Sequence, residues 1–387
     1  MSIINYNSHY IDNDDINAVI SSLRSKKITQ GEENKLFEEK IKSVFKTKYC
    51  SVVSSGTAAL HLCSLALGFK KNDIVISSPI TFLAGPNSVN YCNATIDFVD
   101  IDERTYNLDV NKLEQKIKFY KKRKKNIKAV IATDYAGQPC DWRKLKSLSK
   151  KYKFYLINDN CHAIGAKYLN DIGYASKFAD LVIHSYHAVK NITTGEGGSV
   201  LTNNRNLYKK IESLKSHGLV KINKKKAENP NWPFLMKYLG FNYRITDFQC
   251  ALGISQLKKL NKFLIKRKKI ANIYTRSLKN LENLKIPYIS KECDHGYHLY
   301  PVLINFDNTK INKKELINKF KKKGINLQIH YYPIHLQPYY KKKFKFRKGD
   351  FPIAEKFFSQ VLSLPIYFRL KDNEIYKITR FLENILK

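Results

Sequence analysis

Short apolar runs alternate with amphipathic stretches between about residues 50 and 205 of the chain. The apolar runs are rich in valine and isoleucine and about four to eight residues long, which is typical of buried strands. Segments with helical spacing, at 57–67, 110–120 and 142–153, lie between several of these runs. The alternation predicts an α/β fold with a mostly parallel sheet that helices cover on both faces. The predicted strands span 50–55, 73–78, 94–101, 128–135, 153–159 and 179–185.

The pattern changes after about residue 250, where long helical stretches flank only a few strand-like runs. This change predicts a large α/β domain over residues 1–250 and a smaller C-terminal α+β domain over residues 251–387. In the smaller domain we expect a long helical segment at 247–278, strands at 298–306 and 326–331, and helices at 313–324 and 372–387.

Length and composition fit a two-domain protein without a membrane segment. The chain has 387 residues, 43% of them hydrophobic, which is enough for two cores. No run approaches the roughly 20 apolar residues that cross a bilayer, and the N-terminus has no secretory pattern. The seven cysteines are scattered and form no CxxC pair, so neither a disulfide framework nor a metal site is expected. These features predict a cytoplasmic protein with no membrane partner.

The chain is strongly basic, with 69 Lys plus Arg against 33 Asp plus Glu and a formal net charge of +36. Such a charge suggests nucleic-acid binding, and a non-catalytic, basic nucleic-acid-binding protein is therefore one alternative. The basic residues are spread over the whole chain, however, and no nucleic-acid-binding motif accompanies them. We predict no nucleic-acid partner, although the excess charge would attract an anionic substrate such as a nucleotide diphosphate.

Polar residues close several predicted strands, where ligands gather in open α/β sheets. Asp134, Asp159 and Ser185 each stand at the end of such a run. Lys190 follows Ser185 by five residues and begins a segment rich in threonine and glycine. A lysine alone would be a solvated surface residue, but its position beside these strand ends indicates a candidate site.

These residues supply what a pyridoxal-phosphate enzyme needs. Lys190 offers an amine to hold the cofactor, and Asp159 offers a carboxylate for the pyridine nitrogen. Gly56 and Thr57 begin a predicted helix after a strand, which suits a phosphate group. Phe82 could lie against the ring. Each feature alone has a structural explanation, such as a helix cap or a core aromatic, so it is their joint occurrence that favours this cofactor.

Six motifs occur along the chain in one order: SSGTAAL, PITFLA, DYAGQP, NDNCHAIGA, SYHAVKNITTGEGG and GFNYRITDFQCALG. In this order they resemble the DegT/DnrJ/EryC1/StrS family of sugar aminotransferases, and the resemblance runs from about Ile28 to Pro365. It implies fold type I of the pyridoxal-phosphate-dependent transferases. It also implies a homodimer with shared active sites.

The resemblance assigns a role to each matching residue. Lys190 and Asp159 would be catalytic, with Lys190 bound covalently to the cofactor and Asp159 paired with its pyridine nitrogen. The NDN sequence around Asp159 departs from the usual acidic and small residues, but its spacing to His162 is kept. The segment IHYYPIHLQPYY matches a part of the family near the sugar nucleotide. His162 would lie near the cofactor's phenolic oxygen, and Phe82 would pack on its ring. Gly56, Thr57 and Ser185 would bind its phosphate, and Asn242 would reach the phosphate group of the neighbouring subunit. His330 and Tyr331 would contact the substrate.

Within the family, HAVKNITTGEGG, DYAGQP and SHGL are most similar to members of pseudaminic acid biosynthesis. This implies transfer of an amino group, from L-glutamate, to C4 of a UDP-linked 4-keto-6-deoxy-N-acetylhexosamine. The same chemistry on another nucleotide-linked 4-keto sugar, of perosamine or bacillosamine type, is the main alternative. A sugar dehydratase of this fold would carry histidine in place of Lys190, so we do not expect that activity.

Overall fold

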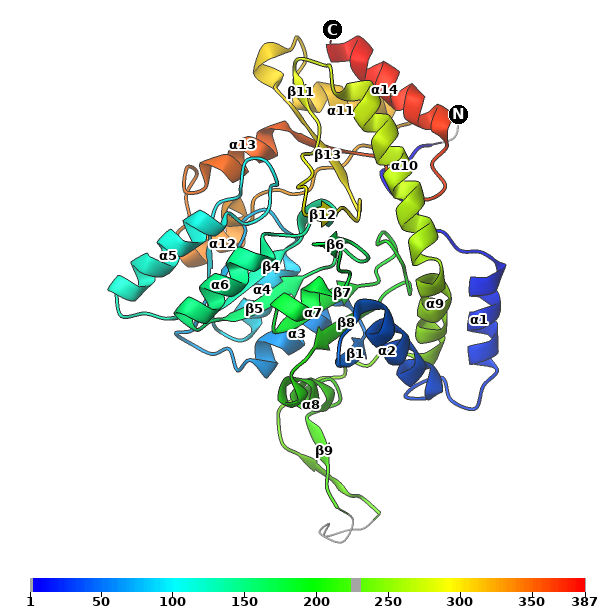
Figure 1. Ribbon diagram of the computed structural model, residues 1–387, viewed down its shortest axis with the longest axis vertical. Helices are drawn as coiled ribbons and strands as arrows, with labels where there is room; N and C mark the ends of the chain where they lie inside the picture. Colours follow the sequence, from blue (N-terminus) through cyan, green and yellow to red (C-terminus); the bar gives the residue numbers. More distant parts are fainter. Residues whose placement is uncertain (1–2, 224–230, 387) are drawn as a thin grey trace.

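A seven-stranded sheet forms the centre of the larger part of the molecule in the computed structural model, which describes residues 3–223 and 231–386 (Figure 1). The strand order is β1-β8-β7-β5-β4-β2-β3, and β8 alone runs antiparallel to its neighbours. The predicted α/β fold with a mostly parallel sheet is thus confirmed. The strands are β1 (Tyr49–Val53), β2 (Ile74–Ser77), β3 (Thr95–Phe98), β4 (Ile127–Thr133), β5 (Tyr155–Asp159), β7 (Leu181–Ser185) and β8 (Gly198–Thr202).

The two faces of the sheet pack into separate cores because successive side chains of a strand point to opposite sides. In β4, Ala129 and Ile131 join one core and Val130 and Ala132 join the other. Helices α3, α4 and α8 contribute to the first core, and α2, α5, α6, α7 and α9 to the second. These helices are α2 (Glu32–Phe45), α3 (Gly56–Ala66), α4 (Ala84–Tyr91), α5 (Val110–Lys122), α6 (Trp142–Tyr152), α7 (Tyr174–Phe178), α8 (Arg205–Leu214) and α9 (Asp247–Lys258).

A third core lies near the two chain ends, where the C-terminal elements gather around a small antiparallel sheet (Figure 1). The sheet has the order β11-β13-β14, and the long helix α10 connects this part to the large sheet. Ile4 also packs in this core, so residues from the beginning and from the end of the described chain lie together here. Its elements are α10 (Leu260–Leu278), β11 (Leu284–Lys285), β13 (Tyr300–Ile304), α11 (Lys313–Lys322), β14 (Val361–Leu364) and α14 (Asp372–Leu386).

The remaining elements include a second small sheet and several short helices and strands. A two-stranded hairpin of β9 and β10 extends away from the body below α8 (Figure 1). No helix among residues 3–223 and 231–386 is both long and apolar enough to cross a membrane. The further elements are α1 (Asn13–Leu23), β6 (Lys167–Tyr168), β9 (Leu219–Lys221), β10 (Phe234–Met236), β12 (Cys293–Asp294), α12 (Pro338–Phe344) and α13 (Pro352–Gln360).

Two predictions for the C-terminal part differ from the structure. The strand expected at 326–331 is wrong, because only Gln328 pairs with the small sheet, through an isolated bridge with Ser363, and residues 329–331 form no regular strand. The helical segment expected at 247–278 is two helices, α9 and α10, that meet at Lys259. The domain boundary after residue 250 stays a prediction; it falls within α9, whose apolar side chains pack in the second core.

Candidate active site

A cavity of about 600 Å³ opens where the parallel strands β5 and β7 end. The N-terminus of α3 and the segment 328–331 close it from other sides. Nine of the ten residues predicted for the site line this cavity, although they come from widely separated parts of the sequence. They are Gly56, Thr57, Phe82, Asp159, His162, Ser185, Lys190, His330 and Tyr331.

The first turn of α3 offers backbone amides to the cavity. Ser55 caps the helix, and its side chain accepts a hydrogen bond from the Ala58 amide at 3.0 Å. The amides of Gly56 and Thr57 precede this bond at the helix N-terminus, where the helix dipole favours an anion. A Cβ atom at Gly56 would lie 2.8 Å from the Ser185 Cβ, so only glycine allows this close approach. The arrangement suits a bound phosphate group.

Lys190 reaches the cavity from the loop that follows β7. Its backbone amide donates to the carbonyl of His187 at 2.9 Å, which fixes a turn at this point. Burial of the side chain lowers the pKa of Lys190, and the negative charge of Asp159 opposes this effect. A lowered pKa leaves more of the amine neutral near pH 7, which is the form that attacks a carbonyl group.

Asp159 stands at the end of β5 and is 5% exposed. Its carboxylate accepts two long hydrogen bonds, from the Cys161 amide at 3.2 Å and from the Thr133 hydroxyl at 3.3 Å. Thr133 is in turn bonded to Thr81 at 2.9 Å. These bonds orient the carboxylate and leave acceptor capacity for a group in the cavity, since two oxygens can accept about four hydrogen bonds.

Three buried histidines lie along the wall near Lys190. His162 binds the Tyr331 hydroxyl through Nε2 at 3.0 Å, and its ring centre is 4.5 Å from that of His298. Burial, with the positive charge of Lys190, holds the pKa values of His162 and His298 well below the usual range and lowers that of His330 to about 3. All three are therefore neutral at pH 7. The Nδ1 atoms of His162 and His298 have no hydrogen-bond partner among the described residues.

Two aromatic residues flank the opening of the cavity. Phe82 is 55% exposed, and its ring centre lies 6.0 Å from that of Tyr331. His330, beside Tyr331, is anchored by a 2.9 Å hydrogen bond from its ring to the Ser363 hydroxyl, and its carbonyl accepts from Tyr135 at 2.6 Å. The wall that includes Tyr331 is thus held by the small domain and by the end of the large sheet.

Asn242 is the one predicted residue that does not line the cavity. It forms an isolated bridge with Ser216 and its side chain is exposed. The next residue, Tyr243, accepts a hydrogen bond from the Ser54 amide at 2.9 Å, so this segment lies beside the start of α3. Its predicted contact with a neighbouring subunit stays a prediction.

Several lining residues were not predicted from the sequence. His298 is the first residue of the strand predicted at 298–306, where it looks like one more core position. His187 Nε2 and Glu196 Oε1 lie 3.7 Å apart, and both residues belong to SYHAVKNITTGEGG, so that motif contained a usable signal. Tyr6 and Cys161 also line the cavity. The position of Tyr6, next to the third core, had no sequence signal.

The residues present fit pyridoxal phosphate. A helix N-terminus with space only for glycine can hold the phosphate, and Asp159 can pair with a protonated ring nitrogen. Lys190 brings an amine of lowered pKa to the same cavity, and the unpartnered Nδ1 atoms of His162 and His298 can bond polar groups of a ligand. The cavity volume lies within the range usual for cofactor and small-molecule sites.

Comparison with known proteins places these features in a family. Residues 9–383 match the model of the DegT/DnrJ/EryC1/StrS aminotransferase family. The UDP-4-amino-4,6-dideoxy-N-acetyl-β-L-altrosamine transaminase of Campylobacter jejuni is 37% identical, over 100% of this chain and 99% of the relative.

Solved structures agree over almost the whole chain. Helicobacter pylori PseC, an aminotransferase of pseudaminic acid biosynthesis, superposes with a TM-score of 0.89 at 30% identity, covering 100% of this chain and 99% of PseC. A protein of Streptococcus pneumoniae described as a sugar aminotransferase, in its PLP form, has a TM-score of 0.89 at 26% identity and covers 99% and 98%. The chain belongs to the DegT/DnrJ/EryC1/StrS aminotransferase family, which confirms the predictions of fold type I, of aminotransferase activity and of pyridoxal phosphate as cofactor.

Proposed function

We propose that the enzyme transfers an amino group from L-glutamate to C4 of UDP-2-acetamido-2,6-dideoxy-β-L-arabino-hex-4-ulose. The product would be UDP-4-amino-4,6-dideoxy-N-acetyl-β-L-altrosamine, an intermediate on the route to pseudaminic acid. The observation that carries the chemistry is that Lys190 and Asp159 line one cavity with the N-terminus of α3. The relatives from Campylobacter and Helicobacter support the choice of sugar.

Lys190 is proposed as the residue that holds the cofactor and moves protons. When bound, pyridoxal phosphate supplies an aromatic ring that accepts the electrons released as a C–H bond of the amino donor breaks. Lys190 would hold the cofactor between turnovers, and its amine, once released, would take the proton from the donor α-carbon as a general base. The resulting ammonium group returns that proton as a general acid, and it acts in the reverse order when the keto sugar receives the amino group.

Asp159 and the phosphate-binding residues are proposed to orient the cofactor beside that amine. The Asp159 carboxylate would keep the pyridine nitrogen protonated, which makes the ring a better electron acceptor. The amides of Gly56 and Thr57, with the Ser185 hydroxyl, would bind the phosphate at the start of α3. Phe82 would pack against one face of the ring.

Side chains of the cavity wall near Lys190 are proposed to contact the phenolic oxygen of the cofactor and the sugar of the substrate. His162 is neutral and bonded to the Tyr331 hydroxyl, so the two side chains can exchange donor and acceptor roles. We assign His162 to the phenolic oxygen of the cofactor, and His330 and Tyr331 to the substrate. Their position on the cavity wall near Lys190 supports this assignment.

A homodimer with shared active sites is proposed as the active form. Lys190 is the only lysine or arginine among the described residues that line the cavity, whereas the substrate contains a diphosphate. A second subunit could supply further contacts, with Asn242 as the predicted contact to the neighbouring phosphate group. All seven cysteines are free thiols, which suits the predicted cytoplasmic location.

The substrate assignment is tested by product analysis with purified enzyme and pyridoxal phosphate. We expect L-glutamate and the UDP-linked β-L-arabino 4-keto sugar to give 2-oxoglutarate and one aminosugar, identified by mass spectrometry and NMR. A GDP-linked 4-keto-6-deoxy sugar of perosamine type, and the UDP-linked 4-keto sugar of bacillosamine type, serve as competitors in parallel assays. A larger kcat/KM with either competitor would replace the proposed substrate while keeping the chemistry.

A further inference from the structure

The N-terminal segment of residues 4–10 runs from the small domain to the active site. At its start, Ile4 forms an isolated parallel bridge with Ile325. At its end, the Tyr10 carbonyl accepts a hydrogen bond from Gln256 Nε2 of α9 at 2.9 Å. The segment is therefore fixed at both ends, by the small domain and by a helix of the second core.

Asn7 ties the middle of this segment to the loop that contains Lys190. The buried Asn7 side chain donates through Nδ2 to the Val189 carbonyl at 2.9 Å. The preceding residue, Tyr6, is held from the other side, because its carbonyl accepts a hydrogen bond from the Ile366 amide at 3.1 Å. Tyr6 thus has a defined position near Lys190, although the two residues are far apart in the sequence.

The side chain of Tyr6 lies on the wall of the active-site cavity and is half-buried. Its ring centre is 5.5 Å from that of His330. No group of the described residues forms a hydrogen bond with the Tyr6 hydroxyl, whereas the hydroxyl of the neighbouring Tyr331 is bonded to His162. Burial raises the pKa of Tyr6, so this hydroxyl is neutral at pH 7 and can both donate and accept.

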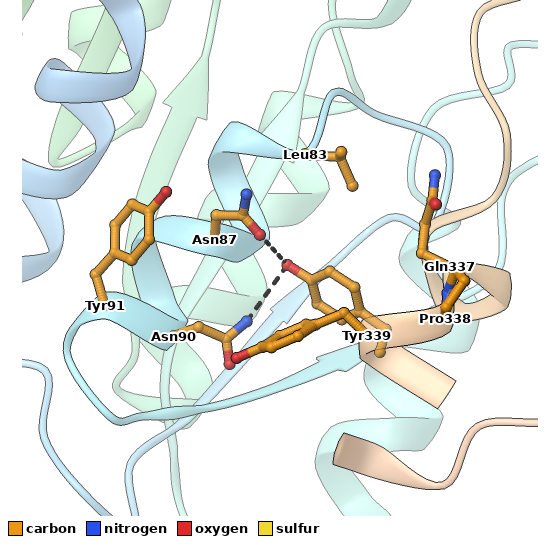
Figure 2. Close-up of a pocket in the computed structure, with 8 residues that line it drawn as sticks. Leu83, Asn87, Asn90, Tyr91, Gln337, Pro338 and Tyr339 are labelled. Carbon is orange, nitrogen blue, oxygen red and sulfur yellow. Dashed lines mark hydrogen bonds between the residues drawn. The ribbon is translucent and has the colours of Figure 1, made fainter. Parts of the chain in front are cut away.

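A second cavity, of about 420 Å³, lies between α4 and α12 and has a different set of lining residues. Figure 2 shows Asn87 and Asn90 of α4 on one side of it and Gln337 on the other. Of these two cavities, Tyr6 lines only the one that contains Lys190. A ligand group that meets the Tyr6 hydroxyl must therefore share the cavity in which the reaction takes place.

The cavity wall around Tyr6 is uncharged. His330 is neutral at pH 7 because burial lowers its pKa to about 3, and burial raises the pKa of Tyr331. A carboxylate placed against these groups would lose its hydration without gaining a cation. Hydroxyl and amide groups lose less on burial, and neutral hydroxyl and imidazole groups can form hydrogen bonds with them. This wall therefore suits the neutral ring of a hexose better than the charged side chain of glutamate.

We propose that Tyr6 is a specificity-determining residue that binds the hexose of the substrate through its hydroxyl group. The C4 carbonyl of the keto sugar lies near Lys190, and a hydroxyl or acetamido group of the same ring forms a hydrogen bond with Tyr6. Asn7 positions the N-terminal segment so that Tyr6 completes the sugar-binding wall. This inference rests on the proposed function, because it assumes that a keto sugar is the amino acceptor.

The two half-reactions of the enzyme separate a role in sugar binding from a role in folding. The first converts the pyridoxal-phosphate-loaded enzyme with L-glutamate, and the second converts the pyridoxamine-phosphate-loaded enzyme with the UDP-linked 4-keto sugar. In Tyr6→Phe, loss of one hydrogen bond between neutral groups should raise the half-saturating concentration of the keto sugar about fivefold. The half-saturating concentration of L-glutamate, and the affinity for UDP measured by calorimetry, should stay at the wild-type values.

Tyr10→Phe is the matched control, since Tyr10 lies on the same segment and does not line the active-site cavity. It should leave the half-saturating concentrations of both substrates unchanged. Tyr6→Ala removes the ring as well as the hydroxyl and should weaken binding of the keto sugar further than Tyr6→Phe does. Circular dichroism verifies that each variant is folded.

Two results would overturn the proposal. One is an equal half-saturating concentration of the keto sugar in the wild type and in Tyr6→Phe. The other is a loss of the same size in both half-reactions, which would show that Tyr6 supports the fold or the cofactor and does not distinguish the sugar. Failure of the wild type to release 2-oxoglutarate from L-glutamate would instead remove the proposed function, and this failure appears in the half-reaction in which Tyr6 has no assigned role.

Discussion

Two aspartates at the ends of neighbouring parallel strands have very different surroundings. Asp134 directly follows β4 and Asp159 ends β5, and the Asp134 amide donates to the Asp159 carbonyl at 3.2 Å. Asp134 is fully buried, and Asp159 is 5% exposed and lines the cavity with Lys190. The register of the sheet pairs Asp159 with Thr133, so Asp134 lies one residue further along and its side chain points to the opposite face.

The difference lies in the donors that each carboxylate accepts. Asp134 receives four short hydrogen bonds, which saturate it, whereas Asp159 has two longer ones. A saturated carboxylate stabilises the fold, and one with free acceptor capacity can bind a ligand. The donors to Asp134 are the Cys140 amide at 2.7 Å, Trp142 Nε1 at 2.9 Å, Asn160 Nδ2 at 3.0 Å and the Tyr174 hydroxyl at 2.7 Å.

The largest effect is expected for Lys190→Ala, whose residual kcat is the lowest value with which the aspartate variants are compared. Without the amine the enzyme loses both its covalent hold on the cofactor and its proton carrier, so kcat should fall by at least about 10⁴-fold. The measurement is steady-state release of 2-oxoglutarate, with circular dichroism to verify folding. Folded Lys190→Ala enzyme with more than a small residual rate would contradict the assigned role.

Asp159→Asn should come next, because it removes one charge while keeping the side-chain shape. The cofactor ring would lose the partner that keeps its nitrogen protonated, and kcat should fall about 10²–10³-fold. Thermal unfolding should change little, since the carboxylate accepts only two long bonds. A strongly lowered Tm with near-normal activity would show that Asp159, like Asp134, stabilises the fold and does not serve the site.

The matched variant Asp134→Asn should have the opposite profile. In the variant, the amide nitrogen would face hydrogen-bond donors, because it replaces a carboxylate oxygen that accepts hydrogen bonds from them. This should lower the free energy of unfolding by about 2–3 kcal/mol. Cofactor affinity and kcat of the folded fraction should stay near the wild-type values. Denaturant unfolding and a cofactor titration measure the two quantities, and lost cofactor binding at unchanged stability would place Asp134 in the site.

The smallest effect concerns the pH dependence of cofactor attachment. Burial lowers the pKa of Lys190 and the charge of Asp159 opposes this, so Asp159→Asn should lower that pKa further. Attachment needs the neutral amine and rises as pH passes through the pKa, so the rising limb should move to lower pH. Borohydride trapping of pyridoxal phosphate on the Lys190 peptide, followed by mass spectrometry, measures how much cofactor is attached at each pH. A shift of this pH dependence to higher pH in Asp159→Asn would contradict the electrostatic interaction between Lys190 and Asp159.

The sequence predicted the strand ends well because local pattern determines them. Alternating apolar runs located β5 and β7, and with them Asp159 and Ser185, while the glycine after β1 marked the start of α3. The sequence analysis assigned Asp159, and not Asp134, to the pyridine nitrogen, but it did not predict the groups that surround Asp134. The donors that saturate Asp134, such as Trp142 and Tyr174, come from later segments, and only the fold brings them to it.

The part of the site from the small domain was harder to predict. The apolar spacing of 326–331 resembles a strand, yet only Gln328 forms a bridge with the small sheet, and His330 and Tyr331 lie on the cavity wall. His298 looks like a core residue in the sequence because its burial and its role in the cavity coincide. The contact predicted for Asn242 depends on a second chain, which no local pattern describes.

The central claim is that Lys190 and Asp159 operate a glutamate-dependent aminotransferase site. The most direct test is the absorbance spectrum of the wild type, loaded with pyridoxal phosphate, before and after addition of L-glutamate. We predict a visible band of the protein-bound cofactor that falls on addition, while the shorter-wavelength band of pyridoxamine phosphate rises with release of 2-oxoglutarate. A protein that shows no visible band after loading, or a band that L-glutamate leaves unchanged, would contradict the claim.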